Sequence, residues 1–299
     1  MIWLDSPYIA NIPISHAISS IGLQLGESLK RVAAALVLIP IVVLAALYAD
    51  AFWLCLAASA IILGAILEYN NFKLTGKRDS LGNALLVVFA VASPFAVFVI
   101  GEKALLPLVI GATFVFFIHG IVGRAEEPKD AALSVALKTL GLVYIALPIT
   151  FLFLIAVLEP QGRLWLLFLL IVIWANDTFA YCTGRLIGRH KLSPEISPGK
   201  TIEGAVGGLI GGGLAAYVFN HYVHLGIAAH WIIALSIVIG VAGIFGDLAE
   251  SLLKRSAGVK DSGSIIPGHG GILDRMDSLF FSAPILYYFL LWGLRTLTP

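Results

Sequence analysis

The chain has 299 residues, of which 59% are hydrophobic and 12% are charged. Soluble globular proteins carry about 25% charged residues, so this chain has too few to cover a water-soluble body of its size. The composition therefore excludes a soluble protein and places most of the chain in lipid. The net charge of +1 identifies no partner, because the placement of charges matters more than their sum.

Residues 1–29 differ in pattern from the rest of the chain. Five apolar residues recur there at helical spacing among Ser, Gln and Glu: Ile14, Ile18, Ile21, Leu25 and Leu29. Such a face predicts a short amphipathic helix on the membrane surface, and a flexible tail is the alternative. We therefore divide the chain into an N-terminal segment, 1–29, and a membrane-embedded domain, 30–299.

The remainder contains nine long apolar stretches. A bilayer core of about 30 Å needs about 20 apolar residues in a helix. The stretches that meet or approach this length are roughly 32–49, 51–68, 83–100, 104–122, 139–157, 164–182, 203–221, 230–249 and 279–297. The predicted fold is thus an all-α polytopic membrane protein with about nine transmembrane helices.

The basic residues give the orientation. If the N-terminus is cytoplasmic, 16 of the 19 Lys and Arg residues fall in inside segments, and the outside segments hold only Lys103, Arg163 and Arg295. This bias follows the positive-inside rule, and one span more or fewer would scramble it. The two long inside segments, 183–202 and 250–278, hold most of the unusual polar residues, so we expect the functional site there.

The segment 246–278 places carboxylates at two helix ends. The eighth stretch runs on past the membrane, and on a continuous helix Asp247, Ser251 and Lys254 share one face. Asp274 and Asp277, three residues apart at the start of the ninth helix, would also project together. Asp247 directly follows an apolar run, where a carboxylate costs up to about 2.5–3.5 kcal/mol towards the bilayer centre. That cost requires a partner, and a metal ion is the natural one.

The same segment has features that bind phosphate. Gly268, Gly270 and Gly271 precede the ninth helix, where free amides and the helix dipole predict an anion site. Carboxylates beside cations suit Mg²⁺, which takes one or two carboxylates and completes its shell with phosphates and water. We interpret His269 as a contact to phosphate or to metal-bound water. The remaining phosphate charge would be held by Lys254, Arg255, Lys260 and Arg275. For Arg255 and Lys260 an ordinary solvated loop is the alternative.

A second polar group lies at 176–204. Asp177 is near the inner end of the sixth stretch, and the run Ser-Pro-Gly-Lys-Thr-Ile-Glu-Gly at 197–204 leads into the seventh helix. Gly-Lys-Thr is shared with P-loops, but Ser193 stands where a P-loop requires glycine. What remains is Lys200, the Thr201 hydroxyl and free amides at a helix start, which bind phosphate. Thr201 as a helix cap, with Glu203 in the first turn, is a compatible alternative.

Glycines repeat along the seventh stretch. Gly204, Gly208 and Gly212 are four residues apart, with Gly207 and Gly211 beside them. Such a face allows another helix to pack closely. The partner helix could belong to the same chain or to a second subunit.

The run from Ser251 to Asp277 resembles the signature of the phosphatidate cytidylyltransferases, or CDP-diacylglycerol synthases. The residues that match it are Ser251, Lys254, Arg255, Lys260, Asp261, Pro267, His269, Gly270, Gly271, Asp274, Arg275 and Asp277. The runs that begin at Lys30, Asp177, Lys191 and Ser197 are also similar to the family, so the resemblance extends from about residue 30 to the end. The chain departs from the family at Phe179, often glycine, and at Ile202, often tryptophan.

The resemblance implies transfer of the cytidylyl group of CTP to phosphatidic acid in phospholipid biosynthesis. It implies a multi-pass protein of the bacterial inner membrane, with its site facing the cytoplasm, and a homodimer; no nucleic acid is expected. Mg²⁺ is the expected cofactor, with a second cation left open, and its ligands would be Asp247 and Asp274, with Asp277 as a third candidate. The expected catalytic residues are Asp247, Lys254, Arg255, Lys260, Asp261, His269, Asp274 and Arg275. The expected substrate-binding residues are Asp177, Ser197, Lys200, Thr201, Glu203, Ser251, Gly270 and Gly271.

Two other functions are weighed against this one. CTP-dependent lipid kinases, such as polyprenol kinases, resemble the chain at Asp177, Gly184, Gly188 and the block from Lys200 to Gly204. The complete Ser251–Asp277 run favours the transferase. A transporter would suit nine spans with broken helices, but transporters place charges near the bilayer midplane and often contain inverted repeats. Here the charges gather at one face, and no repeat is detected.

Overall fold

The architecture is almost entirely helical. The structure is a computed structural model that describes residues 39–72, 74, 79–123, 127–263 and 270–293. A short apolar helix, Ile39–Tyr48, comes first. It is followed by α2 (Ala51–Asn71), α3 (Ser80–Ile100), η1 (Glu102–Ala104), α4 (Leu105–Val122), α5 (Pro128–Gly141), η2 (Leu142–Ala146), α6 (Leu147–Val157), α7 (Gly162–Ile187), β1 (Lys191–Ser193), β2 (Ser197–Thr201), α8 (Ile202–Val223), α9 (Ala229–Ser256), α10 (Leu273–Tyr288) and η3 (Phe289–Gly293). The all-α prediction is confirmed, with one small hairpin added.

Seven helices in the described part of the chain are long and apolar enough to cross a membrane. They correspond to the seven predicted stretches between 51–68 and 230–249, which confirms a polytopic membrane protein. The stretches 32–49 and 279–297 are described only in part, so the total of nine and the cytoplasmic N-terminus stay predictions. The predicted surface helix in 1–29 lies outside the described residues. Helix α9 extends to Ser256, as expected for a helix that continues past the membrane.

The π-helical turn η2 joins α5 and α6 into one helix, Pro128–Val157. It precedes Pro148, which has no N–H and whose ring would clash with the carbonyl of Tyr144 in a regular α-helix. The Tyr144 hydroxyl donates a hydrogen bond of 3.1 Å to the carbonyl of Gly246 in α9. A Cβ at Gly246 would overlap the carbonyl of Asp277 in α10. The helix Pro128–Val157, α9 and α10 therefore meet at Gly246, one residue before Asp247.

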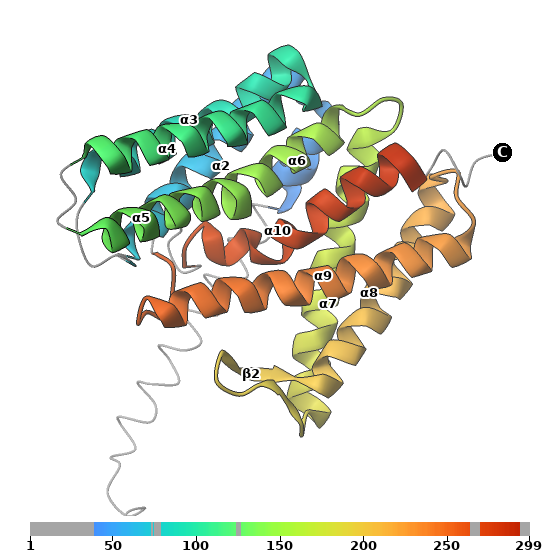
Figure 1. The fold of residues 1–299 in the computed structure, drawn as a ribbon. Helices are drawn as coiled ribbons and strands as arrows, with labels where there is room; N and C mark the ends of the chain where they lie inside the picture. The colour runs from blue at the N-terminus through green and yellow to red at the C-terminus, as the bar shows by residue number, and fades with distance from the viewer. Residues whose placement is uncertain (1–38, 73, 75–78, 124–126, 264–269, 294–299) are drawn as a thin grey trace, which may run out of the picture.

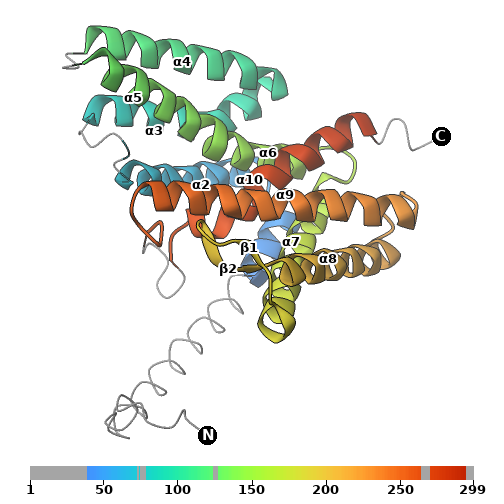
Figure 2. The same cartoon turned by 60° about the horizontal axis from the view of Figure 1, so that its bottom comes forward.

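The helices form two groups, and α9 and α10 lie between them (Figure 1). Helices α3, α4 and α5 lie together on one side, and α7 and α8 lie on the other, in both views (Figures 1 and 2). Helix α10 packs against α9 and α6, and α9 also packs against α8. The central core is built from fully buried side chains of α6, α7, α9 and α10, among them Ile149, Phe168, Ile232 and Phe280.

The glycine face of α8 packs against α7 of the same chain. A Cβ at Gly204 would lie 2.8 Å from the Ala180 carbonyl oxygen, and one at Gly208 would lie 2.7 Å from the Asn176 carbonyl oxygen. A Cβ at Gly211 would overlap the ring of Phe179. Only glycine allows the two backbones to approach this closely. The open question of the partner helix is thus answered within the chain, and the face gives no support to a dimer.

The inside segment 183–202, expected to be a loop, is more regular than predicted. Helix α7 continues to Ile187, and β1 pairs antiparallel with β2, with Lys191 opposite Thr201 and Ser193 opposite Ser197. The Ile202 amide also donates to the His190 carbonyl at 2.9 Å. The hairpin therefore leads the chain from the end of α7 directly to the start of α8.

Candidate functional site

The hairpin is fixed to α7 and α8 at Thr201. The Thr201 hydroxyl accepts a hydrogen bond of 3.1 Å from the Gly204 amide, which confirms the predicted helix cap. A Cβ at Gly184 would lie 2.9 Å from the Thr201 hydroxyl oxygen, so glycine is needed in α7 at this contact. The end of β2 is thereby held over the last turns of α7, which places Lys200 beside Asp177 of that helix.

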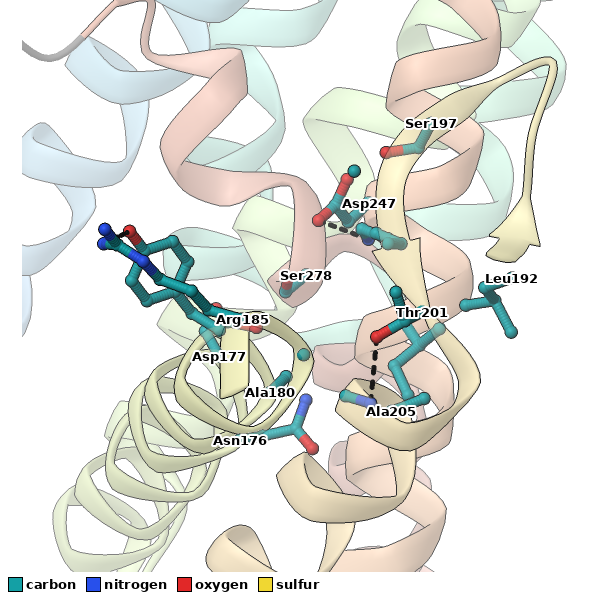
Figure 3. A pocket seen from close by; sticks show the side chains of 16 residues that line it. Asn176, Asp177, Ala180, Arg185, Leu192, Ser197, Thr201, Ala205, Asp247 and Ser278 are labelled. Atoms are coloured by element: carbon teal, nitrogen blue, oxygen red, sulfur yellow. Dashed lines mark hydrogen bonds and ion pairs between the residues drawn. The ribbon is translucent and has the colours of Figure 1, made fainter. Parts of the chain in front are cut away.

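A cavity of about 460 Å³ opens between the hairpin, the last turns of α7, the start of α8 and the part of α9 that carries Ile244 and Asp247. Figure 3 shows its polar side chains arriving from several elements: Asp177 and Arg185 from α7, Ser197 and Thr201 from β2, and Asp247 from α9. Arg185 Nη1 donates a hydrogen bond of 3.0 Å to the Tyr181 hydroxyl. Neither Tyr181 nor Arg185 is among the predicted site residues, although the positive-inside bias places Arg185 in an inside segment.

Lys200 and Asp247 form an ion pair in this cavity. Lys200 comes from the 176–204 segment and Asp247 from the 246–278 segment, so the pair joins the two groups that the sequence had singled out separately. The Ser251 hydroxyl lies 3.4 Å from Asp247 Oδ1, as their shared helix face predicts. The side chains of Lys200 and Asp247 are 26% and 29% exposed, so both remain accessible from the cavity.

Asp177, Asp247 and Asp277 interact electrostatically, although they come from three different helices. Their like charges repel one another, and Lys200 is the cation that acts on all three. A concentration of carboxylates around one ammonium group suits an additional cation. Among the described residues, no three His, Cys, Asp or Glu side chains are grouped closely enough to hold a metal by themselves. Mg²⁺ would therefore need substrate oxygens and water to complete its shell.

A second, more buried network surrounds Lys254. Its ammonium group lies 2.5 Å from Glu250 Oε2 and 2.6 Å from Asp274 Oδ1. Glu250 is 1% exposed and is not among the predicted site residues, although its i,i+4 spacing to Lys254 is a recognisable signal. Lys254 thus links α9 to the start of α10.

Asp274 is oriented by contacts to both oxygens. Oδ1 faces Lys254, and Oδ2 accepts hydrogen bonds from the Ser262 amide (3.2 Å), the Ser262 hydroxyl (2.9 Å) and the Gly271 amide (2.9 Å). Burial alone would raise the pKa of Asp274, but the hydrogen bonds from Lys254, Gly271 and Ser262 outweigh it and lower the pKa to about 2. The carboxyl group is therefore ionised at neutral pH.

The prediction of free amides at the start of α10 is wrong for Gly271, Ile272 and Leu273, while the part that concerns Gly268 and Gly270 stays a prediction. The Gly271 amide donates to Asp274, and the amides of Ile272 and Leu273 donate to the two oxygens of Glu68 at 2.9 and 3.0 Å. The prediction failed because a carboxylate from α2, some 200 residues away, already satisfies these donors. Gly270 has φ of +80°, which explains the requirement for glycine there.

The other predicted residues are placed as follows. Arg255 is exposed, and its Nε donates at 3.3 Å to the Ile196 carbonyl at the hairpin turn. Glu203 accepts hydrogen bonds from the amides of Arg189 (3.0 Å) and His190 (3.2 Å), which fixes the loop before β1. His269 lies outside the described residues. The exposed residues of the set also include Lys260, Asp261 and Arg275. Substrate contacts for all of these stay predictions.

Comparison with known proteins gives a consistent result. The model of the cytidylyltransferase family matches residues 29–292. A phosphatidate cytidylyltransferase of Bacillus subtilis is 33% identical over 234 residues, which cover 78% of this chain and 86% of the relative. One of Staphylococcus haemolyticus is 33% identical over 264 residues, covering 87% and 96%. One of Haemophilus influenzae is 44% identical over 133 residues, covering 43% and 46%.

Proposed function

The chain belongs to the cytidylyltransferase family, and from this premise we propose that the cavity between the hairpin and helices α7, α8 and α9 is its active site. The reaction is transfer of the cytidylyl group of CTP to phosphatidic acid, which yields CDP-diacylglycerol and pyrophosphate. The single observation that carries the proposal is the Lys200–Asp247 ion pair in the cavity, because it unites the two polar segments in one accessible place.

The chemistry requires alignment more than proton transfer. An oxygen of the phosphatidate phosphate attacks the α-phosphorus of CTP, a new P–O bond forms, and the bond to the β-phosphate oxygen breaks to release pyrophosphate. The attacking oxygen is already an anion, so no strong general base is needed. Catalysis then depends on holding two anions in line and neutralising the charge of the triphosphate.

The cations of the cavity suit the phosphate groups. Lys200 and Arg185 are supported by partners that substrate can replace, Asp247 and the Tyr181 hydroxyl respectively. An ammonium and a guanidinium group both bind phosphate oxygens, the second in a bidentate fashion. We expect Lys200 to exchange its carboxylate partner for a phosphate oxygen when CTP binds. Arg255 would act indirectly, by holding the turn of the hairpin through Ile196.

The carboxylates suit Mg²⁺. The proposed ligands are Asp247 and Asp274, with Asp277 as a third candidate. The convergence of like charges at Asp177, Asp247 and Asp277 supports a cation beside Asp247, and Asp274 is added from the family resemblance. When bound, Mg²⁺ neutralises triphosphate charge and polarises the α-phosphorus. Asp247 would hold it from within α9 and Asp274 from the first turn of α10, while Lys254 fixes Asp274. A second cation remains part of the proposal.

The cavity would face the cytoplasm. Arg185 and Lys200, which both line it, belong to the segments that the positive-inside bias places inside. The relatives are bacterial, so we propose the inner membrane as its location. A homodimer is proposed from the family resemblance alone, because the glycines of α8 are used within the chain.

The experiment that tests this function follows the label of CTP. Purified protein is incubated with phosphatidic acid and CTP labelled at either the α- or the γ-phosphorus. We expect only the α-label to enter lipid, as CDP-diacylglycerol. Transfer of the γ-label alone would instead indicate a lipid kinase. A photoreactive CTP analogue should in addition label peptides from 177–204, and labelling confined to α2–α6 would contradict the assigned site.

A further inference from the structure

Glu68 is a buried carboxylate at the end of an apolar helix. The preceding 17 residues of α2, 51–67, contain no charged side chain, and Glu68 is 2% exposed. A carboxylate in such a place is costly unless it is well hydrogen-bonded. Its partners among the described residues come from the segment that precedes and begins α10: the Ser262 hydroxyl at 3.1 Å, the Ile272 amide at 2.9 Å and the Leu273 amide at 3.0 Å.

These contacts connect Glu68 to Asp274. The Ser262 hydroxyl that lies 3.1 Å from Glu68 Oε2 also lies 2.9 Å from Asp274 Oδ2. Asp274 is in the first turn of α10, the turn whose amides Glu68 binds. The space is closely fitted, because a Cβ at Gly263 would lie 2.7 Å from Glu68 Oε1 and one at Gly271 would overlap both Ser262 and Glu68.

The two carboxylate oxygens of Asp274 therefore differ in how fully their lone pairs are used by hydrogen bonds. A carboxylate offers about four lone-pair positions, two on each oxygen. The Ser262 and Gly271 amides fill the two lone-pair positions of Oδ2, which also shares the single proton of the Ser262 hydroxyl with Glu68, whereas Lys254 is the described donor to Oδ1. Oδ2 is therefore fully occupied, and Oδ1 keeps the capacity to bind a cation.

We propose that Glu68 is a positioning residue of the active site. It holds the first turn of α10 and, through Ser262, orients Asp274 so that Oδ1, beside Lys254, is the oxygen that would bind a metal ion. The inference rests on the proposed role of Asp274 as a metal ligand. Glu68 itself does not line the cavity and acts only through Ser262 and α10. Partners that orient metal ligands commonly change metal affinity by about 10–100-fold when they are removed.

Asp79 provides a matched control elsewhere in the molecule. It too is a carboxylate that caps a helix, since it accepts from the Gly82 amide of α3 at 2.9 Å. It also binds Lys138 at 2.7 Å and His119 at 2.9 Å. None of these groups contacts Asp274 or the cavity. Loss of the Asp79 carboxylate removes a helix cap and an ion pair without disturbing the proposed metal site.

The test measures Mn²⁺ binding to purified full-length protein in detergent, by the loss of the free Mn²⁺ signal in electron paramagnetic resonance. Glu68→Gln keeps the size of the side chain but turns an NH₂ group towards a backbone amide or the Ser262 hydroxyl. We expect the Mn²⁺ dissociation constant to rise about tenfold or more. The Mg²⁺ concentration for half-maximal turnover should rise in parallel. Asp79→Asn should lower the melting temperature and leave Mn²⁺ binding unchanged.

Wild-type Mn²⁺ affinity in folded Glu68→Gln would overturn the proposal and reduce Glu68 to a helix cap. If Asp274→Asn also bound Mn²⁺ normally, the premise about Asp274 would fail as well, so the two failures are distinguishable. Should Glu68→Gln not fold, Ser262→Ala carries the same test, because it cuts the link to Asp274 and leaves the caps on Ile272 and Leu273 in place. Unchanged Mn²⁺ affinity in Ser262→Ala would then overturn the proposal.

Discussion

Two charged groups of the proposed site differ in burial. Lys200 and Asp247 stand beside the cavity with side chains 26% and 29% exposed. Lys254 and Asp274 are 13% and 14% exposed, and their partner Glu250 is 1% exposed. An accessible pair can exchange its partners for substrate at little cost, whereas a buried one is held by the protein. The site thus combines an exchangeable pair, Lys200 and Asp247, with a fixed frame formed by Lys254, Glu250 and Asp274.

The largest expected effect comes from the carboxylate of the exchangeable pair. Asp247→Asn should lower kcat about a thousandfold or more, because loss of metal-assisted charge stabilisation costs several kcal/mol of transition-state energy. The melting temperature should change little, since accessible ion pairs contribute about 0–1 kcal/mol. Turnover and thermal unfolding of the same preparation check both statements. Near-normal turnover in Asp247→Asn would remove Asp247 from the metal site.

The second-largest effect is expected when the fixed frame loses its ammonium group. Lys254→Met leaves the carboxylates of Glu250 and Asp274 without their shared ammonium group, and we expect a loss of about 3 kcal/mol in the free energy of unfolding. Adding Glu250→Gln to this variant should recover part of the stability without restoring activity. Thermal or denaturant unfolding in detergent measures the difference. Equal stability of Lys254→Met and Lys200→Met would contradict the distinction between frame and exchangeable pair.

A smaller effect is expected for the cation of the exchangeable pair. Lys200→Met should weaken CTP binding by about 10–100-fold, the range for one charge-assisted hydrogen bond of about 1.5–3 kcal/mol. Its melting temperature should stay near that of the wild type. Steady-state kinetics with CTP as the varied substrate provide the test. An unchanged KM for CTP, with normal kcat, would exclude Lys200 from phosphate binding.

The smallest effect concerns Arg255 and the hairpin. Arg255→Ala removes two long hydrogen bonds at an exposed position, one to the Ile196 carbonyl and one to the Val259 carbonyl, each worth about 0.5–1.5 kcal/mol. We expect a severalfold rise in KM for CTP and little change in kcat, because the hairpin carries Lys200. Arg255→Lys should not restore the wild-type value if the planar guanidinium geometry matters. A large fall in kcat would instead show that Arg255 contacts the reacting groups.

Much of the fold could be predicted because a helix that crosses the bilayer requires a long apolar run, which is visible in the sequence. The seven spans from α2 to α9 follow from apolar runs long enough for a bilayer, and the Thr201 cap follows from local residue chemistry. The shared face of Asp247 and Ser251 also follows from helix geometry. These features depend on neighbours within a few turns of the chain.

The parts that could not be predicted depend on distant residues. Free amides were expected before α10, but Glu68 occupies those of Ile272 and Leu273 across some 200 residues. The contact of Arg255 with Ile196 likewise requires the fold, because nothing near Arg255 in sequence indicates the hairpin turn. A signal did exist for Glu68: a lone carboxylate at the end of an apolar span needs a partner, and none lies nearby on its own helix.

The most direct test of the account asks whether the exchangeable pair and the fixed frame contribute to one cation site. Mn²⁺ binding is measured for the wild type, Asp247→Asn and Asp274→Asn under identical conditions, with Asp79→Asn as the control. We predict that either site variant loses the high-affinity Mn²⁺ site while Asp79→Asn keeps it. Retention of the wild-type stoichiometry and affinity in Asp247→Asn or in Asp274→Asn would contradict the shared site.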